Sequence, residues 1–364
     1  KITDMAEKIL MKGNEAIAYA AINCGCDGYF GYPITPQSEV METLMQEKPW
    51  ETTGMVVLQA ESETSSINMV YGGASCGKKV MTSSSSPGIS LMCEGLSYLA
   101  GCELPCLVVN VMRGGPGLGT IQPSQSDYFQ ATKGGGHGDY RTIVLAPASV
   151  QDMYDYVDLS FELAFKYRNP VMILGDGIIG QMMEKVELSP AKPRRTDEEV
   201  RELCDSWATL GKAASRPGNI VTSLALDADV MEHHNRHLQA KYATIEAEEV
   251  RYETYKTEDA EYLIVAFGCM SRISENVVEL AREDGIKLGV LRPITLYPYP
   301  EKALDALVPQ MKSIMSVELN SGQMVEDVRR IAAGRVPVHF YGRQGGVIPS
   351  PEEIYEAFIK TIKK

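Results

Sequence analysis

The alternation of short apolar runs with longer helical runs most constrains how this chain folds. Over the first half, runs typical of buried strands alternate with runs whose apolar residues recur at helical spacing. The expected strands are residues 28–31, 55–58, 79–82, 106–112, 141–145 and 170–174, and the expected helices are residues 13–24, 37–46, 63–75, 88–100 and 150–165. Strands that alternate with helices form a parallel sheet with helices on both faces. We therefore predict one doubly wound α/β domain over residues 1–187.

The composition changes after this domain. The next residues contain prolines, adjacent arginines and several acids, which is typical of a linker, and residues 227–254 are rich in charged side chains. We predict a linker with one long charged helix over residues 188–259, and a second α/β unit over residues 260–364. Ser350 and Pro351 are a typical N-cap and first residue for its last helix. The expected strands of this unit are 262–267, 287–291, 313–318 and 336–341, and the expected helices are 272–282, 300–307, 325–333 and 351–362.

The composition also argues against several classes of function. The 364 residues carry a formal net charge of −13 at pH 7, which argues against binding nucleic acid or an anionic membrane surface. No run of about 18 uncharged apolar residues is present, so we expect no membrane-spanning helix. Residues 1–4, Lys-Ile-Thr-Asp, lack the basic-then-apolar pattern of a signal peptide. We expect a cytoplasmic protein.

The cysteines and histidines predict no metal site in this chain. None of the eight cysteines forms a C-x₂-C pair, the spacing that zinc and iron–sulfur sites favour. The apolar neighbours of the closest pairs indicate buried, reduced thiols. His233 and His237 stand four residues apart, but an exposed helix face explains them better than a metal site, and His137 is typical of a hydrogen-bonded loop histidine. Any electron transfer is therefore expected to run through another group.

The segment at residues 32–36, Tyr-Pro-Ile-Thr-Pro, places a hydroxyl between two prolines. Proline holds its own φ near −65° and restricts the residue before it. This arrangement is unusual for an ordinary turn, but it suits a hydroxyl that must be aimed into a cleft. The question for the structure is whether Thr35 meets two charged residues further along the chain, Glu63 and Arg113.

Glu63 opens a predicted helix that is rich in small residues and ends in Gly72-Gly73. A carboxylate at a helix N-terminus is favoured by the helix dipole, which is one explanation for this residue. The other is that the small-residue helix lets a flat ligand approach closely. A buried glutamate that faces a ring nitrogen would then share a proton in a short, strong hydrogen bond.

Arg113 ends a predicted buried strand and precedes a glycine-rich loop at residues 114–119. Ligands of parallel sheets bind where strands end, and an arginine there can hold a carboxylate with two hydrogen bonds. A structural ion pair with Asp127 is the alternative. The hydroxyl-rich segment at residues 82–88, which includes Ser86, either caps a helix or presents hydroxyls and amides to a bound cofactor; both interpretations stay open.

Several motifs, in a fixed order along the chain, carry a resemblance to a known family. They are Tyr-Pro-Ile-Thr-Pro at 32–36, Gln-Ala-Glu-Ser-Glu at 59–63 followed by Gly72, Arg113 with its glycine loop, Gln-Pro-Ser-Gln-Ser-Asp at 122–127, Gly-Gly-His-Gly-Asp at 135–139, Arg-Pro-Ile-Thr-Leu at 292–296 and Gly-Arg-Gln-Gly-Gly at 342–346. Nearly the whole chain resembles the α subunits of the 2-oxoacid:ferredoxin oxidoreductases. It is most similar to the branched-chain type, which acts on 3-methyl-2-oxobutanoate (2-oxoisovalerate). Many members of the 2-oxoglutarate type read Ser-Gly-Pro-Gly where this chain has Ser-Ser-Pro-Gly at residues 85–88.

The resemblance implies a thiamine diphosphate enzyme of several subunits. This chain would supply the doubly wound pyrimidine-binding domain and a transketolase C-terminal-like α/β domain. A β subunit would bind the diphosphate through Mg²⁺, and γ and ferredoxin-like δ subunits would handle coenzyme A and carry [4Fe-4S] clusters. The complex would convert a 2-oxoacid and coenzyme A to acyl-CoA and CO₂ and would reduce ferredoxin.

The resemblance also implies roles for single residues. Glu63 would be the catalytic glutamate that hydrogen-bonds N1′ of the aminopyrimidine, and Thr35 and Arg113 would bind the substrate carboxylate. The other residues expected to bind the cofactor are Pro33, Ile34 and Ser86. The alternatives are a subunit for 2-oxoglutarate or another 2-oxoacid, a transketolase-like component that uses no ferredoxin, and a non-catalytic assembly subunit in which Glu63 only caps its helix.

Overall fold

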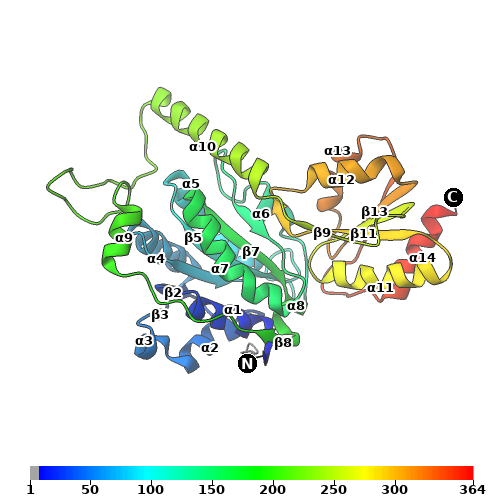
Figure 1. Cartoon of the computed structure of the whole chain (residues 1–364), viewed down its shortest axis with the longest axis horizontal. Helices are drawn as coiled ribbons and strands as arrows, with labels where there is room; N and C mark the ends of the chain where they lie inside the picture. Colours follow the sequence, from blue (N-terminus) through cyan, green and yellow to red (C-terminus); the bar gives the residue numbers. More distant parts are fainter. Residues whose placement is uncertain (1–7, 364) are drawn as a thin grey trace, which may run out of the picture.

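The computed structural model describes residues 8–363, so residues 1–4, where no signal peptide is expected, lie outside the described part. Figure 1 shows a larger N-terminal body and, to its right, a smaller C-terminal body. The charged helix α10 (Ala228–Glu248) runs along the first body and leads toward the second. Within residues 8–363 no helix is long and apolar enough to cross a membrane.

The N-terminal body is built on a seven-stranded sheet. Its strands are β2 (Gly28–Gly31), β3 (Val56–Gln59), β4 (Val80–Ser84), β5 (Cys106–Met112), β6 (Ile143–Leu145), β7 (Pro170–Asp176) and β12 (Thr295–Tyr297). Their order across the sheet is β12-β6-β7-β5-β4-β2-β3, and all neighbours from β6 to β3 pair in parallel. β5 is buried along its whole length, as expected for a central strand covered on both faces.

Helices cover both faces of this sheet. The helices of the body are α1 (Gly13–Asn23), α2 (Glu39–Glu47), α3 (Pro49–Thr52), α4 (Glu63–Ser75), α5 (Ser86–Gly101), α6 (Tyr128–Thr132), α7 (Val150–Tyr167) and α8 (Gly177–Gln181). The connections that contain α4 and α5 lead along the strand order in one direction, and those that contain α2 and α7 lead in the opposite direction. Since crossovers between parallel strands are right-handed, the two pairs lie on opposite faces. In agreement, α4 packs on α5, and α1 packs on both α2 and α7.

The C-terminal body has a five-stranded sheet in the order β14-β13-β10-β11-β9. Its strands are β9 (Tyr252–Tyr255), β10 (Tyr262–Val265), β11 (Leu288–Pro293), β13 (Ser313–Glu318) and β14 (Val338–Gly342). Its helices are α11 (Cys269–Glu283), α12 (Glu301–Leu307), the 3₁₀ turn η1 (Val308–Gln310), α13 (Met324–Ala332) and α14 (Pro351–Ile362). Figure 1 shows α11 and α14 on one side of this sheet and α12 and α13 on the other.

The structure differs from the expected elements in three places. The charged helix does not run over residues 227–254: α10 ends at Glu248, and β9 follows it and pairs antiparallel with β11. The predicted linker contains a further helix, α9 (Asp197–Cys204), whose N-terminus carries a capping box. Finally, β1 (Lys8–Lys12) and β8 (Met183–Glu187), which pair antiparallel, were not predicted. Charge and propensity are local signals, whereas these strands form because a distant segment offers a partner.

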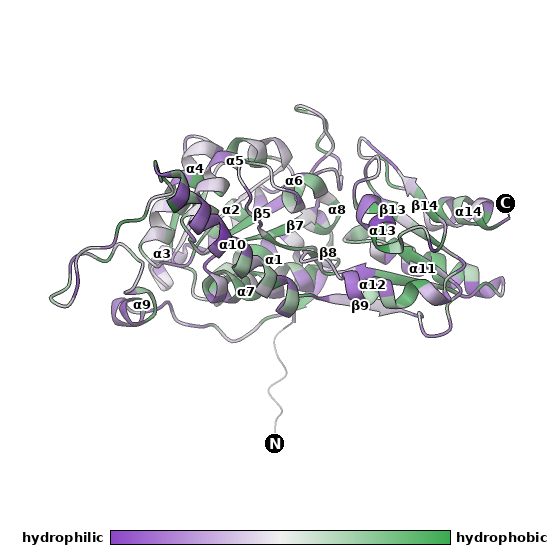
Figure 2. Cartoon of the chain, turned by 90° about the horizontal axis from the view of Figure 1, so that it is seen from above, coloured by the Kyte–Doolittle hydropathy of each residue, from purple (hydrophilic) through white to green (hydrophobic). Residues whose placement is uncertain are grey.

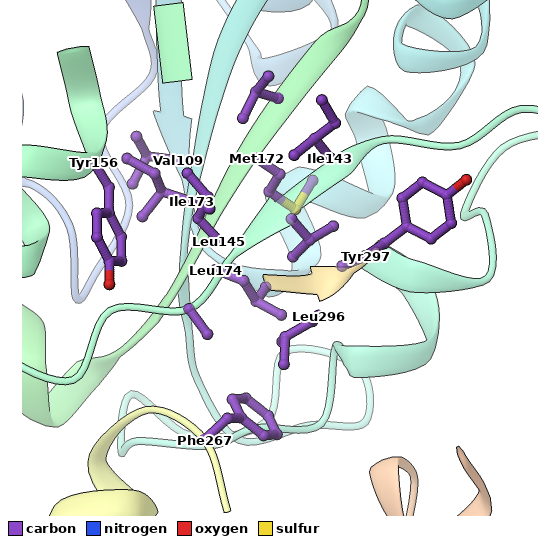
Figure 3. Packing of buried hydrophobic residues seen from close by; sticks show 14 of the residues in the cluster. Val109, Ile143, Leu145, Tyr156, Met172, Ile173, Leu174, Phe267, Leu296 and Tyr297 are labelled. Atoms are coloured by element: carbon purple, nitrogen blue, oxygen red, sulfur yellow. The ribbon is translucent and has the colours of Figure 1, made fainter. Parts of the chain in front are cut away.

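One strand from the second half of the sequence completes the first sheet. β12 pairs antiparallel with β6. The sheet therefore contains one antiparallel pair, whereas the prediction was a parallel sheet. Figure 3 shows the side chains of Leu145, Leu174 and Leu296 gathered in one apolar cluster, with Phe267 close by. Hydrophilic residues are prominent instead on α10 and α12 (Figure 2). The two bodies therefore share one continuous core.

The predicted cap of the last helix allows a test of local stability. Ser350 Oγ accepts a hydrogen bond from the amide of Glu353 at 3.3 Å, and Glu353 Oε2 accepts one from the amide of Ser350 at 2.9 Å. Ser350→Ala removes one half of this capping box, so we expect the free energy of unfolding to fall by about 1 kcal/mol. Urea unfolding followed by circular dichroism measures the change. Ser350→Asp, which keeps a capping oxygen, should stay near the wild-type value; an equal loss in both variants would contradict the capping role.

Candidate functional site

The residues singled out in the sequence lie after four neighbouring parallel strands. Thr35 follows β2, Glu63 follows β3, Ser86 follows β4 and Arg113 follows β5. These strands are adjacent in the order β5-β4-β2-β3. Because the carboxyl ends of parallel strands meet at the same edge of a sheet, the four loops share one edge, where ligands of such sheets bind.

Arg113 is a buried cation with no acidic partner in residues 8–363. Its Nη1 donates to the carbonyl oxygen of Thr35 at 3.0 Å and its Nη2 to the carbonyl oxygen of Leu118 at 3.0 Å. Nε is buried and has no partner in this part of the chain, and the residue is only 9% exposed. A guanidinium in this state retains donor capacity for an anion that the chain itself does not provide.

The ion pair between Arg113 and Asp127 that the sequence left open does not form. Asp127 Oδ2 instead accepts hydrogen bonds from Ser86 Oγ at 2.6 Å and from Asn110 Nδ2 at 2.9 Å. Burial raises the pKa of Asp127, and these two hydrogen bonds act in the opposite direction. Asp127 therefore holds the first turn of α5 against β5 and leaves Arg113 free of a counter-ion.

Thr35 lies directly beside Arg113, as its carbonyl contact shows. Its side chain is exposed, and its hydroxyl has no hydrogen-bond partner among the described residues. Pro33 is exposed and Ile34 is half-buried in the same segment. The Tyr-Pro-Ile-Thr-Pro segment thus presents a hydroxyl and apolar atoms toward the surface that adjoins the guanidinium.

Glu63 is the first residue of α4 and is 6% exposed. Ser62 caps the helix by accepting a hydrogen bond from the amide of Ser65 at 3.3 Å, so Glu63 is not the cap. Within residues 8–363 its carboxylate receives no hydrogen bond and pairs with no cation. It packs against the first turn of α5, where a methyl group on Gly88 would lie 2.6 Å from Glu63 Oε1 and 2.0 Å from Ser84 Oγ.

The serine run contains more open groups than the sequence indicated. Ser86, the predicted cofactor contact, already donates its hydroxyl to Asp127 and accepts from the amide of Arg113 at 3.1 Å. By contrast, the hydroxyls of Ser84 and Ser85 are buried and have no partner in the described chain. Ser85 is the N-cap residue of α5, but its side chain makes no capping hydrogen bond. The run of hydroxyls was the available signal, but only side-chain positions separate these residues.

The other candidates stay apart from this site. His237 Nε2 lies 3.1 Å from Glu103 Oε2 on the side of α10, and the backbone oxygen of His137 accepts from Ser97 Oγ at 2.7 Å. No group of three His, Cys, Asp or Glu in residues 8–363 is arranged to hold a metal ion. All eight cysteines are free thiols.

Two family models match the chain. The model described as pyruvate flavodoxin/ferredoxin oxidoreductase, thiamine diphosphate-binding, matches residues 19–255. The model described as pyruvate:ferredoxin oxidoreductase core domain II matches residues 260–354. The first covers more than half of the chain and includes all four loops of the site.

Curated relatives match over nearly their whole length. Ketoisovalerate oxidoreductase subunit VorB of Methanothermobacter marburgensis is 50% identical over 337 residues, which cover 93% of each chain. 2-Oxoglutarate synthase subunit KorA of Methanothermobacter thermautotrophicus is 36% identical over 376 residues, 98% of this chain and 99% of that protein.

Solved structures give the same architecture. The 2-oxoglutarate:ferredoxin oxidoreductase of Magnetococcus marinus, solved with 2-oxoglutarate, coenzyme A and succinyl-CoA bound, matches with a TM-score of 0.84 and 28% identity. The match covers 98% of this chain and 66% of that one. A split-gene transketolase, described as an inactive β4 tetramer, matches with a TM-score of 0.61 and 12% identity, over 97% of this chain and 98% of that one, and supports the fold alone.

Two glycines near the site test its packing. Gly88→Ala forces a methyl group into Glu63 and Ser84, and overpacking of this kind destabilises a protein by about 1–3 kcal/mol. Gly72→Ala is the matched control, because a methyl on Gly72 of α4 meets no atom within 4 Å and alanine is favoured over glycine in a helix by about 0.5–1 kcal/mol. We expect urea unfolding to show a loss for the first variant and no loss for the second. Equal stability of both variants would contradict the close contact at Gly88.

Proposed function

The chain belongs to the 2-oxoacid:ferredoxin oxidoreductases, and from this premise we propose that it is the subunit that activates thiamine diphosphate and binds the carboxylate of a branched-chain 2-oxoacid. The family match confirms the resemblance that the sequence motifs indicated. It also confirms the fold class, a thiamine diphosphate-binding α/β domain with a transketolase C-terminal-like domain. We take the domain limits to be residues 1–187, 188–259 and 260–364.

The observation that carries the proposal is Glu63, a residue only 6% exposed whose carboxylate has no partner among the described residues. Burying a carboxylate is unfavourable unless a partner supplies hydrogen bonds or charge. The absence of a side chain on Gly88 lets Glu63 and Ser84 approach the first turn of α5 closely, and the hydroxyls of Ser84 and Ser85 have no partner in the described chain. These groups fit the aminopyrimidine ring of thiamine diphosphate, with Glu63 holding a proton shared with ring atom N1′. We further assign Pro33, Ile34 and Ser86 to the wall around the ring.

When bound, thiamine diphosphate supplies the carbon nucleophile and the electron sink for decarboxylation of a 2-oxoacid. The part of this chain is to hold the substrate while that chemistry proceeds. Arg113, with an unpaired Nε and no acidic partner among the described residues, fits the carboxylate that leaves as CO₂. Thr35, one hydrogen bond away from Arg113, fits the same group through its hydroxyl.

The substrate and partners that we propose follow the relatives. The relative that is 50% identical is named for ketoisovalerate, which supports 3-methyl-2-oxobutanoate over 2-oxoglutarate as the substrate. We propose a β subunit that binds the diphosphate with Mg²⁺, together with γ and δ subunits for coenzyme A and [4Fe-4S] clusters, and ferredoxin as electron acceptor. A cytoplasmic location suits eight free thiols, because disulfides form in oxidising compartments.

A partner also explains an exposed apolar face next to the site. The edge strand β3 exposes Val56 by 50% and Leu58 by 42%, and Met45 of α2 is exposed by 50%. Together with Pro33, Met45 and Leu58 line a groove of about 620 Å³. An exposed apolar edge strand is normally covered by another chain or protected by charges. We propose that the β subunit covers this face and closes the site over Glu63.

Glu63→Gln tests the catalytic role. The amide cannot hold the shared proton, so we expect the assembled enzyme to lose turnover by at least roughly 10²-fold, within the range for acid–base groups. Assembly, followed by size-exclusion chromatography, should be unchanged. Glu61→Gln is the matched control, because Glu61 is exposed two residues earlier in the same loop. Near-wild-type turnover of Glu63→Gln would contradict the catalytic role and would leave the alternative of a non-catalytic assembly subunit.

Arg113→Ala tests the carboxylate-binding role. A lost charged hydrogen bond is worth about 1.5–3 kcal/mol, so kcat/KM for 3-methyl-2-oxobutanoate should fall by roughly 10- to 100-fold. Arg236→Ala, which removes an exposed arginine on α10, should have no effect. The same assay with 2-oxoglutarate and pyruvate measures the substrate preference. An unchanged kcat/KM for every 2-oxoacid would remove Arg113 from the site.

A further inference from the structure

We propose that the C-terminal domain positions Arg113 by clamping the glycine loop, with Gln125 and Gly346 as the positioning residues. The inference rests on the proposed role of Arg113 in binding the 2-oxoacid carboxylate. It adds that the second domain, which contributes no group to the four strand ends, sets the geometry of that contact.

The orientation of Arg113 depends on the loop that follows it. Two N–H groups of its guanidinium donate to backbone oxygens. One of these acceptors, the carbonyl oxygen of Leu118 at 3.0 Å, lies inside this loop. The loop closes on itself as a hairpin: Arg113 bridges antiparallel to Pro123, and the amide of Gly114 donates to the carbonyl oxygen of Gln122 at 2.9 Å. The amide of Thr120 donates to the carbonyl oxygen of Gly114 at 2.8 Å. A shift of this hairpin therefore moves the guanidinium.

The base of the hairpin is held by the C-terminal domain through Gln125, which is fully buried. Its amide donates to the carbonyl oxygen of Leu319 at 2.9 Å, and its Oε1 accepts from the amide of Leu319 at 3.1 Å. Its Nε2 donates to the carbonyl oxygen of Phe267 at 2.7 Å, and its own carbonyl oxygen accepts from Asn320 Nδ2 at 2.8 Å. Every polar group of one residue is thus bound to the other domain.

A second contact holds the hairpin at Gln122, three residues before Gln125. The loop after β14 reaches Gln122, where a methyl group on Gly346 would lie 2.1 Å from Gln122 Cβ. Gln122 is the residue whose carbonyl oxygen accepts from Gly114, next to Arg113. The hairpin is therefore fixed at its base by the hydrogen bonds that Gln125 makes to the C-terminal domain, and along its side by the contact of Gly346 from the same domain.

This arrangement separates substrate binding from cofactor binding. Glu63 packs on Gly88, and Ser86 of the same turn bonds to Arg113 only through the backbone at the end of β5, so displacement of the loop beyond Arg113 leaves the Glu63 side of the site in place. A residue that only stabilises the fold would, when replaced, lower the melting temperature without a selective effect on the substrate. A positioning residue would raise KM for the 2-oxoacid while thiamine diphosphate still binds with its normal Kd.

The test is Gly346→Ala in the assembled enzyme, with Gly334→Ala as the matched control in the same domain. Both glycines have positive φ, +94° and +73°, but a methyl on Gly334 meets no atom within 4 Å. For Gly346→Ala we expect KM for 3-methyl-2-oxobutanoate to rise roughly 10-fold, as for a weakened charged hydrogen bond, with kcat unchanged, as expected when a contact that binds the substrate is lost. The Kd of thiamine diphosphate should be unchanged. Hydrogen exchange at the amides of Gly114 and Thr120 should become faster, and Gly334→Ala should leave all four quantities unchanged.

Gln125→Asn weakens the clamp from its other end and gives a second, independent variant. It should also raise KM for 3-methyl-2-oxobutanoate. The KM of either variant in the assembled enzyme tests the positioning role. If Arg113→Ala weakens 2-oxoacid use while Gly346→Ala and Gln125→Asn leave KM unchanged, the positioning role is overturned and the proposed function stands. If Arg113→Ala itself has no effect, the proposed function fails, and the positioning role fails with it.

Discussion

The parallel pairing of β2, β3, β4 and β5 is the constraint on which the site depends. Each strand runs in the same direction, so the four loops that follow them must meet at one edge whatever their sequences are. A hydroxyl, a carboxylate, a serine run and a guanidinium that are far apart in the sequence thereby come together. Reversing one of these strands would move its loop to the opposite edge of the sheet.

The groups at this edge share a second property: they are buried but lack partners in the described chain. Glu63 has no donor, Arg113 Nε has no acceptor, and the hydroxyls of Ser84 and Ser85 are unpaired. Buried polar groups without partners are unfavourable and are normally rare in folded proteins. Three of the unpaired atoms, Ser84 Oγ, Ser85 Oγ and Arg113 Nε, lie at this edge, where ligands of parallel sheets bind. The exposed edge strand β3 lies beside them and is the face on which we propose that a partner chain binds.

The sequence predicted elements well where the signal is local. β5 and α14 have the predicted bounds, because a continuous apolar run marks a central strand and Ser350 with Pro351 marks a helix start. The sequence missed β9 and β12, since edge strands of three or four residues depend on a partner far along the chain. That the loops of Thr35, Glu63 and Arg113 lie at one edge could be anticipated from the predicted parallel sheet, in which each of them follows a strand. Which serine hydroxyl lacks a hydrogen-bond partner could not be anticipated, because Ser84 and Ser86 differ only in what surrounds their side chains.

The exchange of strands between the two halves also bears on how the domains work together. β12 belongs to the C-terminal half of the sequence but pairs with β6 of the first sheet, and Leu296 packs into the first core. A hinge between two independent cores would let the C-terminal body swing, but a shared strand and the buried side chain of Gln125 resist this motion. The C-terminal domain is thus fixed relative to the four strand ends, which is the condition for it to hold a loop of the site in one position.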